Sequence, residues 1–346
     1  MKRIDFIDGY RGVAILLVIL FHAYSRWALV VPYGAKFAEF PVFKLGYFGV
    51  QLFFLISGFV ILMTLERTEG FLKFIYKRWL RLFPALLIAS LLVYFTASLL
   101  PERPTGTPTL RSLIPGFLFL QPTFIELITG SKIDPIEGSF WSLFIEMKFY
   151  LVFGTLYFTL GRSKAILTIC LMFIFYTISS FFESTSLTFI SKLFSLQFCG
   201  WFAIGALIYS YFKTQEKAYI AYALLMGCLQ IFNYRNGLGT AIMATIILVL
   251  FMLPIYFEKL RPIFSNKFFL FFGFISYPFY LIHENALVAL IIKMHKLIPA
   301  IPDFLIPLIP VCILCLIAYF IVKIAEPVVR GFIKRTVALL PVNTIK

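Results

Sequence analysis

Residues 11–31 read RGVAILLVILFHAYSRWALVV, an apolar stretch whose basic side chains are Arg11, His22 and Arg26. A helix needs about 20 predominantly apolar residues to cross a hydrocarbon core of ~30 Å. The stretch has no small-residue cleavage site, so it is interpreted as an uncleaved first membrane span rather than as a signal peptide.

Similar apolar runs recur along the whole chain. Hydrophobic residues make up 61% of the 346 residues and charged residues 14%, whereas soluble proteins have about 45–50% and 25%. Short charged connections separate the runs, which excludes a single large soluble core. The sequence therefore predicts an all-α, polytopic integral membrane protein with about ten transmembrane helices. The predicted spans are 11–31, 45–65, 79–99, 140–160, 165–183, 190–212, 218–233, 238–256, 268–292 and 304–325.

The distribution of basic residues predicts how these spans are oriented. Cytoplasmic loops of membrane proteins carry an excess of Lys and Arg. With the N-terminus inside, the inner connections hold 20 Lys and Arg residues and the outer connections hold 10. We therefore expect both termini in the cytoplasm, residues 100–139 outside, and a location in the cytoplasmic (inner) membrane of a bacterium. The net charge of +15 is attributed to this bias and to anionic lipid, not to nucleic acid.

The domain organisation is expected to be simple. We predict one transmembrane domain over residues 1–335, a short cytoplasmic tail at 336–346 and no additional soluble domain. The longest connection, 100–139, is rich in Pro and Gly and contains an apolar patch from Leu113 to Leu120. Such a patch favours a re-entrant or interfacial segment over disorder.

The five cysteines lie inside apolar runs and are interpreted as small buried side chains, not as a disulfide framework. Two of them have the CxxC spacing, but no His or acidic residue accompanies them, so no metal or redox site is predicted. The five are Cys170, Cys199, Cys228, Cys312 and Cys315.

Ionisable side chains at membrane depth are costly and are usually functional. Arg11 and His22 are eleven residues apart, about three whole helical turns. They therefore share one helix face, with Arg11 near the inner surface and His22 near the middle of the span. A lone Arg at a helix end is often a snorkelling anchor, but a histidine on the same face within the span indicates function.

Three further polar groups leave alternatives open. Arg78 and Arg81, with Lys77 beside them, are either a positive-inside anchor or a phosphate-binding site facing the cytoplasm. Ser142 and Glu146 share a helix face, and Glu146 either pairs with Lys148 or an Arg, accepts a hydrogen bond from an acceptor hydroxyl, or orients a histidine. The polar face of Tyr280, His283 and Glu284 is either an aromatic-belt helix end or part of a site.

Five short motifs follow one another between residues 8 and 284. They are Arg11-Gly-Val-Ala with His22 eleven positions on, Phe53-Phe-Leu-Ile-Ser57-Gly58-Phe59, Arg78-Trp-Leu-Arg81-Leu-Phe-Pro84, Trp141-Ser142-Leu-x-x-Glu146-x-x-Phe149-Tyr150 and Ile275-Ser-Tyr-x-x-Tyr-Leu-x-His283. In these motifs the sequence resembles the acyltransferase-3 family of integral membrane acyltransferases.

The resemblance implies ten membrane helices and transfer of an acyl group, typically acetyl, from cytoplasmic acyl-CoA to an extracytoplasmic acceptor. It implies an essential Arg–His pair, Arg11 and His22, and a donor-binding pair, Arg78 and Arg81. Many members have a second Glu and a Gln where this chain has Met147 and Lys148, which leaves Glu146 in place but alters the acceptor environment.

Together the pattern and the resemblance predict a membrane O-acetyltransferase of the glycan-modifying type. His22 would be the general base or form an acyl-histidine, with Arg11 and Glu146 in the catalytic group. The donor, acetyl-CoA, would bind Arg78, Arg81 and Lys77, and no metal is invoked. The acceptor, a glycan or lipid-linked sugar, would lie near Trp141, Ser142, Tyr150 and His283. The alternative is a secondary transporter with an intramembrane Arg/His/Glu relay.

Overall fold

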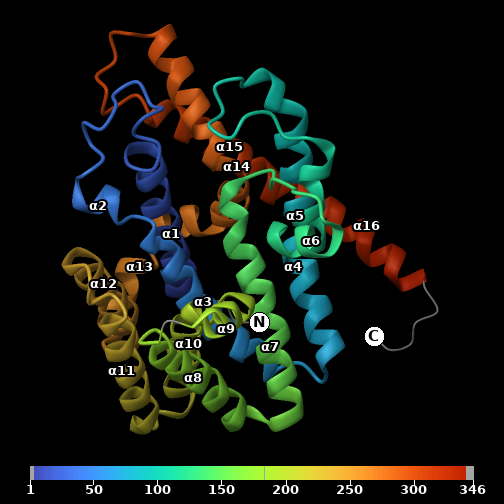
Figure 1. The fold of residues 1–346 in the computed structure, drawn as a ribbon, viewed down its shortest axis with the longest axis vertical. Helices are drawn as coiled ribbons and strands as arrows, with labels where there is room; N and C mark the ends of the chain where they lie inside the picture. The colour runs from blue at the N-terminus through green and yellow to red at the C-terminus, as the bar shows by residue number, and fades with distance from the viewer. Residues whose placement is uncertain (1–3, 183, 340–346) are drawn as a thin grey trace.

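The computed structural model describes residues 4–182 and 184–339, and these residues contain helices and turns but no β-strand. Figure 1 shows them as one helical bundle, in which α16 extends away from the other helices. The α-helices are α1 Asp5–Tyr24, α2 Pro41–Lys44, α3 Phe48–Leu65, α4 Phe71–Thr96, α5 Ile114–Leu118, α6 Pro122–Thr129, α7 Trp141–Leu160, α8 Arg162–Ser179, α9 Thr185–Phe194, α10 Cys199–Thr214, α11 Lys217–Phe232, α12 Leu238–Tyr256, α13 Arg261–Phe264, α14 Lys267–Leu297, α15 Leu308–Phe320 and α16 Glu326–Leu339.

The prediction of an all-α multi-pass membrane protein is confirmed. Among the described residues, eight helices are long and apolar enough to cross a membrane, or up to ten if each of two bent helix pairs is one span. Eight of the predicted spans correspond to these eight helices. The predicted span 190–212 is a pair bent by 60°, and 218–233 is the shorter helix α11 of 16 residues.

The predicted bounds of the first span are wrong. The helix begins at Asp5 and ends at Tyr24, rather than covering 11–31. It ends there because the Tyr24 ring stacks on Phe43, and the hydroxyl of Tyr33 donates a hydrogen bond to the carbonyl of Ala23. His22 consequently lies in the last turn of the helix and not in its middle.

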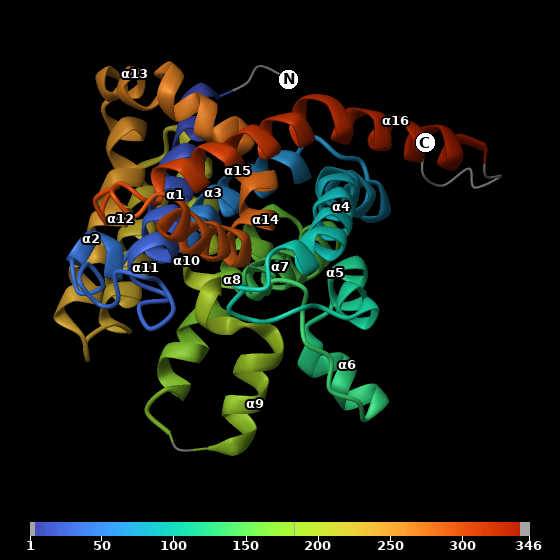
Figure 2. The same cartoon turned by 90° about the horizontal axis from the view of Figure 1, so that it is seen from above.

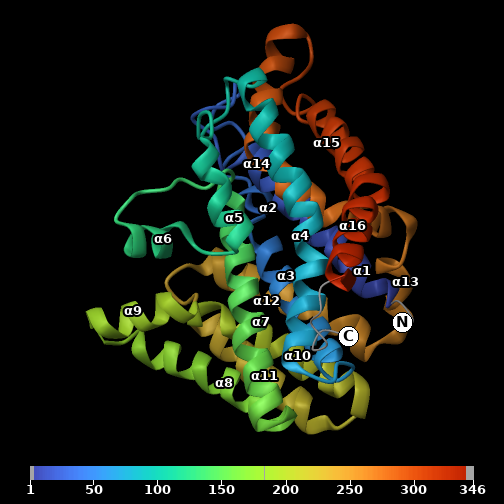
Figure 3. The same ribbon diagram turned by 90° about the vertical axis from the view of Figure 1, so that its right-hand side faces the viewer.

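The helices that hold the polar residues pack around α1. Helix α1 lies against α14 and α3, and α4 contacts both α7 and α16. Figure 3 shows α4 between α7 on one side and α15 with α16 on the other. Figure 2 shows the start of α1, α13 and α16 on one side of the bundle, while α6 and α9 protrude on the opposite side.

Glycines let these helices approach closely. A methyl group on Gly12 would overlap the carbonyl oxygen of Phe269, at the contact between α1 and α14. On α3 and α10, a methyl group on Gly58 or on Gly205 would overlap a carbonyl oxygen of the facing helix. Small residues of this kind are typical of helix contacts in membranes, where packing drives association.

The connection 100–139 contains ordered helical structure. Residues Leu110–Leu118 and Pro122–Thr129 form two short helices that meet at an angle of 108°, a geometry typical of a broken span or a re-entrant loop. This agrees with the expected re-entrant or interfacial segment.

One smaller expectation needs correction. Cys228 and Cys312 are exposed at the surface of the bundle instead of buried, because α11 and α15 each leave one side uncovered. Of the stretch expected as a tail, residues 336–339 belong to α16, and 340–346 lie outside the described residues.

We predict that Gly205→Ala destabilises the bundle. The added methyl group meets the backbone of α3 around Leu55, so the two helices must separate, and overpacking of this kind costs about 1–3 kcal/mol. The measurement is the thermal unfolding midpoint in detergent, followed by size-exclusion fluorescence. Gly227→Ala is the matched control, since its methyl group would make an ordinary contact with Leu248. Equal midpoints for the two variants would contradict the close α3–α10 contact.

Candidate active site

Four cavities follow one another through the bundle, and each shares wall residues with the next. The first lies between α4 and α16, the second lies at the start of α1, and the last lies near the end of α1. We name them the basic, arginine, glutamate and histidine cavities. The basic and arginine cavities share Arg81 and Arg330. The arginine and glutamate cavities share Arg11, Val60, Arg78 and Arg81. The glutamate and histidine cavities share Val50 and Tyr280.

The arginine cavity has a volume of about 490 Å³. Asp8 pairs with Arg11, and Glu326 pairs with Arg330, so two of its cations are neutralised by carboxylates on its wall. The balance remains positive, which suits an anionic ligand. Four arginines from three helices line it: Arg11, Arg78, Arg81 and Arg330.

Arg78 is held in place by aromatic rings. Its guanidinium carbon lies 5.9 Å from the centre of the Phe74 ring and 5.8 Å from that of Tyr150, within cation–π range. The side chain also donates a hydrogen bond to the hydroxyl of Thr64. Its Nε is buried without a hydrogen-bond partner among the described residues. The guanidinium of Arg78 is therefore held in place with its Nε–H available to donate to a ligand in this cavity.

The glutamate cavity contains the carboxylate singled out from the sequence. Glu146 accepts hydrogen bonds from Ser57 Oγ at 2.7 Å and from the hydroxyl of Tyr150. The pairing with Lys148 that the sequence left open is not formed, since Lys148 Nζ donates to Gln121 Oε1 at 2.7 Å instead. Glu146 therefore faces the same cavity as Arg11 and Arg78, with neutral hydroxyl groups as its hydrogen-bond partners.

Two hydroxyl groups stand where the glutamate and histidine cavities meet. The Tyr280 hydroxyl donates to the carbonyl of Ser139 at 2.9 Å, so the Ser142 hydroxyl, 2.8 Å away, must donate to Tyr280. Tyr280 forms part of both cavity walls. The polar face of α14 is thus buried at a junction of cavities and is not an aromatic-belt helix end.

The two histidines form a pair whose hydrogen bonds define their tautomers. Nδ1 of His22 lies 2.9 Å from the carbonyl of Val18, and Nδ1 of His283 lies 2.9 Å from the carbonyl of Tyr280. Carbonyl oxygens only accept, so both Nδ1 atoms carry the proton. Nε2 of His283, 3.3 Å from Nδ1 of His22, is then unprotonated and is a second, more distant acceptor for the proton that the Val18 carbonyl accepts. This arrangement leaves Nε2 of His22 with a free lone pair, which is the requirement for a base.

The histidine cavity, of about 140 Å³, surrounds this pair on one side. His22, Trp141 and Tyr280 line it, together with the carboxylate of Glu284, while His283 is fully buried beside His22. Trp141 and His22 therefore share one cavity, whereas Ser142 and Tyr150, also predicted on the acceptor side, line the glutamate cavity.

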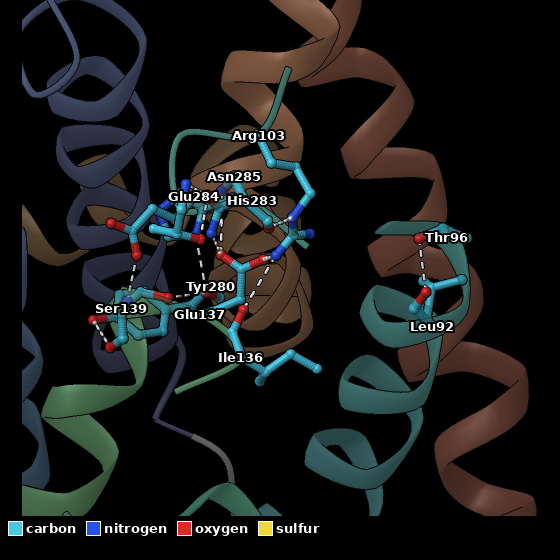
Figure 4. A network of polar contacts seen from close by, with 12 residues as sticks. Leu92, Thr96, Arg103, Ile136, Glu137, Ser139, Tyr280, His283, Glu284 and Asn285 are labelled. Atoms are coloured by element: carbon cyan, nitrogen blue, oxygen red, sulfur yellow. Dashed lines mark hydrogen bonds and ion pairs between the residues drawn. The ribbon is translucent and has the colours of Figure 1, made fainter. Parts of the chain in front are cut away.

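A buried polar cluster fixes the connection 100–139 against this end of the site (Figure 4). Arg103 and Glu137 form an ion pair at 3.1 Å, and Nδ2 of Asn285 donates to Glu137 at 2.6 Å. Oδ1 of Asn285 accepts from Thr105 Oγ at 2.9 Å. Burial raises the pKa of Glu137 to about 7, although Arg103 opposes this shift. Asn285, two residues after His283, therefore holds two parts of the connection.

The structure brings most of the predicted site residues together. Of the three residues predicted to bind the donor, Arg78 and Arg81 line the arginine cavity, whereas Lys77 lines only the adjoining basic cavity. Sequence reasoning missed Arg330, which reaches the site from the helix after the last span, and Ser57, although Ser57 stood in one of the quoted motifs. It also missed Asn285, although this residue directly follows the polar face at 280–284.

These features define a multi-pass membrane protein with a buried polar site that connects an arginine-lined cavity to a histidine. The chain belongs to the acyltransferase-3 family, since the profile of that family, described as an acyltransferase domain, matches residues 4–323. The family resemblance inferred from the motifs is confirmed. Membership of an enzyme family favours the acyltransferase prediction over the transporter alternative.

Two relatives illustrate this similarity. An O-acetyl transferase of Shigella phage Sf6 is 28% identical over 178 residues, which are 50% of this chain and 52% of the phage protein. The O-acetyltransferase OatA of Staphylococcus aureus (strain NCTC 8325 / PS 47) is 28% identical over 159 residues, 42% of this chain and 23% of OatA. The chain thus spans about half the length of the phage relative and about a quarter of OatA. No solved structure matches the chain significantly.

We predict that His22 and His283 both carry their proton on Nδ1, a tautomer that is the minor form in water. Selective ¹⁵N-histidine labelling tests this directly, because the chain has only three histidines. The third, His295, has no hydrogen-bond partner for its Nδ1 among the described residues and serves as the internal control. A His22 signal with the proton on Nε2 would contradict its assignment as a base.

Proposed function

We propose that this protein is a membrane O-acetyltransferase, which transfers an acetyl group from cytoplasmic acetyl-CoA to a hydroxyl group of an extracytoplasmic glycan or glycolipid. Family membership and the names of both relatives support the reaction type. The observation that carries the proposal is the line of cavities from the arginines near the start of α1 to His22 near its end. Such a line lets a donor and an acceptor reach one site from opposite sides of a membrane.

The donor would occupy the arginine and glutamate cavities. Guanidinium groups bind phosphates through paired, charge-assisted hydrogen bonds, and Arg78 and Arg81 both line these cavities. The pantetheine arm is slender and carries no charge, so it suits the narrower glutamate cavity, which has many apolar wall residues. In this arrangement Arg11 neutralises phosphate charge near the donor entrance.

The chemical step would take place at His22. Nε2 of His22 accepts the proton of the acceptor hydroxyl, whose oxygen then attacks the carbonyl carbon of the thioester. The carbon–sulfur bond breaks, and the proton passes from the imidazolium to the CoA thiolate, so that an ester and free CoA are formed. The Val18 carbonyl accepts the Nδ1 proton of His22 at 2.9 Å and Nε2 of His283 shares it at 3.3 Å, so these two acceptors together orient the imidazole, a role comparable to the orienting group of a catalytic triad.

The remaining predicted residues take distinct parts in this proposal. Glu146 and Tyr150 hold each other at the wall of the glutamate cavity, and Tyr150 also contacts Arg78. Trp141 offers an aromatic face in the histidine cavity, where a sugar ring can stack, and Ser142 supports Tyr280 at the junction. The acceptor therefore enters at the histidine cavity, beneath the connection that Asn285 holds.

We predict that His22→Gln reduces acetylation below roughly 1% of the wild-type level, because base catalysis contributes about 10²–10⁴-fold. Glutamine keeps the size and the hydrogen-bonding capacity of histidine but cannot take up a proton. The measurement is mass spectrometry of O-acetyl groups on surface glycans from cells that lack the gene and are complemented with each variant at equal protein level. His295→Gln is the matched control and should retain wild-type product. Near-normal product from His22→Gln would reduce this histidine to a packing role.

A further inference from the structure

The basic cavity lies between α4 and α16 and has a volume of about 400 Å³. It adjoins the arginine cavity through two shared wall residues, Arg81 and Arg330. The donor and acceptor positions proposed above do not include this cavity. Its lining residues are Lys73, Tyr76, Lys77, Leu80, Arg81, Arg330 and Lys334.

Only part of this positive charge is neutralised within the protein. Lys73 pairs with Glu69 at 3.1 Å, and this carboxylate is almost fully exposed to solvent, so the pair is weak. Arg330 pairs with the buried Glu326 one helical turn earlier on α16.

The other three cations have no such partner. In the described part of the chain, no carboxylate lies within ion-pair distance of Lys77, Arg81 or Lys334. Lys77 has one long hydrogen bond, at 3.3 Å, to the hydroxyl of Thr68. All three residues are exposed, so water can solvate them, but their convergence on one cavity favours a ligand with at least two negative charges.

An unused donor lies at the junction with the arginine cavity. Nε of Arg330, which lines both cavities, is buried without a hydrogen-bond partner among the described residues, and Nε of Arg78, which lines the arginine cavity but not the basic cavity, is buried in the same way. A buried donor that stays unpaired costs free energy, so both atoms indicate a ligand that supplies acceptor oxygens. The charged ligand therefore extends from the arginine cavity into the basic cavity.

The wall of the basic cavity also offers an aromatic face. The Tyr76 ring is nearly parallel to that of Trp79, with an interplanar angle of 23°, and Trp79 stacks on Phe83 at 4.6 Å. The rings of Trp79 and Phe83 thus pack beside Tyr76 along α4. A ring supported in this way can stack with a nucleobase, an interaction that every base can make.

We propose that the basic cavity binds the 3′-phosphoadenosine end of the acyl donor, with α16 supplying one wall of the site. The 3′-phosphate lies between Lys77 and Lys334, the adenine stacks on Tyr76, and the diphosphate lies at Arg81 and Arg330. The inference rests on the proposed function and adds to it a recognition element on the helix after the last span. It identifies the donor as a nucleotide thioester and not as a pantetheine arm carried on a protein.

Anionic phospholipid is a second source of phosphate near this helix. A phospholipid diester has a single negative charge and no base, whereas the 3′-phosphate is a doubly charged monoester next to adenine. The pairing of three free cations with an aromatic ring favours the nucleotide. The experiment is therefore carried out in nanodiscs of zwitterionic phosphatidylcholine and repeated with phosphatidylglycerol added.

The test compares binding of CoA with binding of 3′-dephospho-CoA by isothermal titration calorimetry on the full chain. We expect the wild-type protein to bind CoA more tightly by about tenfold, the order expected for charge-assisted contacts to one phosphate. Lys77→Gln combined with Lys334→Gln should remove this preference and leave the affinity for 3′-dephospho-CoA unchanged. Arg335→Gln, an exposed cation next to Lys334 that does not line the cavity, should keep the full preference.

Each other outcome has a separate meaning. Equal wild-type affinities for the two compounds overturn the inference while leaving the proposed function standing. A preference for CoA that survives in the double variant also overturns the inference. If thermal stabilisation by phosphatidylglycerol is lost in that variant as well, the two lysines bind lipid instead of the nucleotide. Binding of neither compound by a wild-type protein that is folded overturns the proposed function together with the inference.

Discussion

Guanidinium groups inside an apolar helical bundle cost free energy, and the rest of the site is arranged around side chains that offset this cost. Charged side chains at membrane depth need partners or water, and four arginines from three helices line the same cavity. Asp8, Glu326 and the aromatic rings around Arg78 offset part of this cost. The positive charge that is not offset gives the arginine cavity a surface that attracts anions. The neighbouring cavities connect this surface to a histidine.

Close helix contacts make this internal space possible. Glycines bring the backbones of α1 and α14 together on one side of the site and those of α3 and α10 on another. Helices α4 and α16 leave room between them for the basic cavity, and both also line the arginine cavity. The site therefore lies between tightly packed helices that hold His22 in place and more loosely packed helices that line the donor cavities.

Much of the fold was predictable because membrane spans depend on local composition. Every predicted span has a helical counterpart, and the shared face of Arg11 and His22 follows from helical geometry alone. The bounds of α1 were not predictable, because Tyr24 ends the helix through contacts with distant residues such as Phe43 and Phe304. Composition describes how apolar a run is but not where its helix stops.

The candidate site was predictable only where a motif marked it. Arg78 and Glu146 stand in quoted motifs, whereas Arg330 lies in a basic stretch that resembles any positive-inside anchor. The pairing of His22 with His283 joins residues 261 positions apart, and no local pattern indicates which histidine supports the other. Contacts of this kind arise from tertiary packing, so a single sequence does not reveal them.

The central claim is that the donor reaches His22 through the line of cavities from the side where α1 begins. The most direct measurement is a cryo-electron microscopy structure of the protein with a non-hydrolysable acetyl-CoA analogue. The account predicts continuous density with the phosphates at Arg78 and Arg81 and the acetyl end beside His22. Density that places the acetyl end away from His22, or the nucleotide outside these cavities, would contradict it.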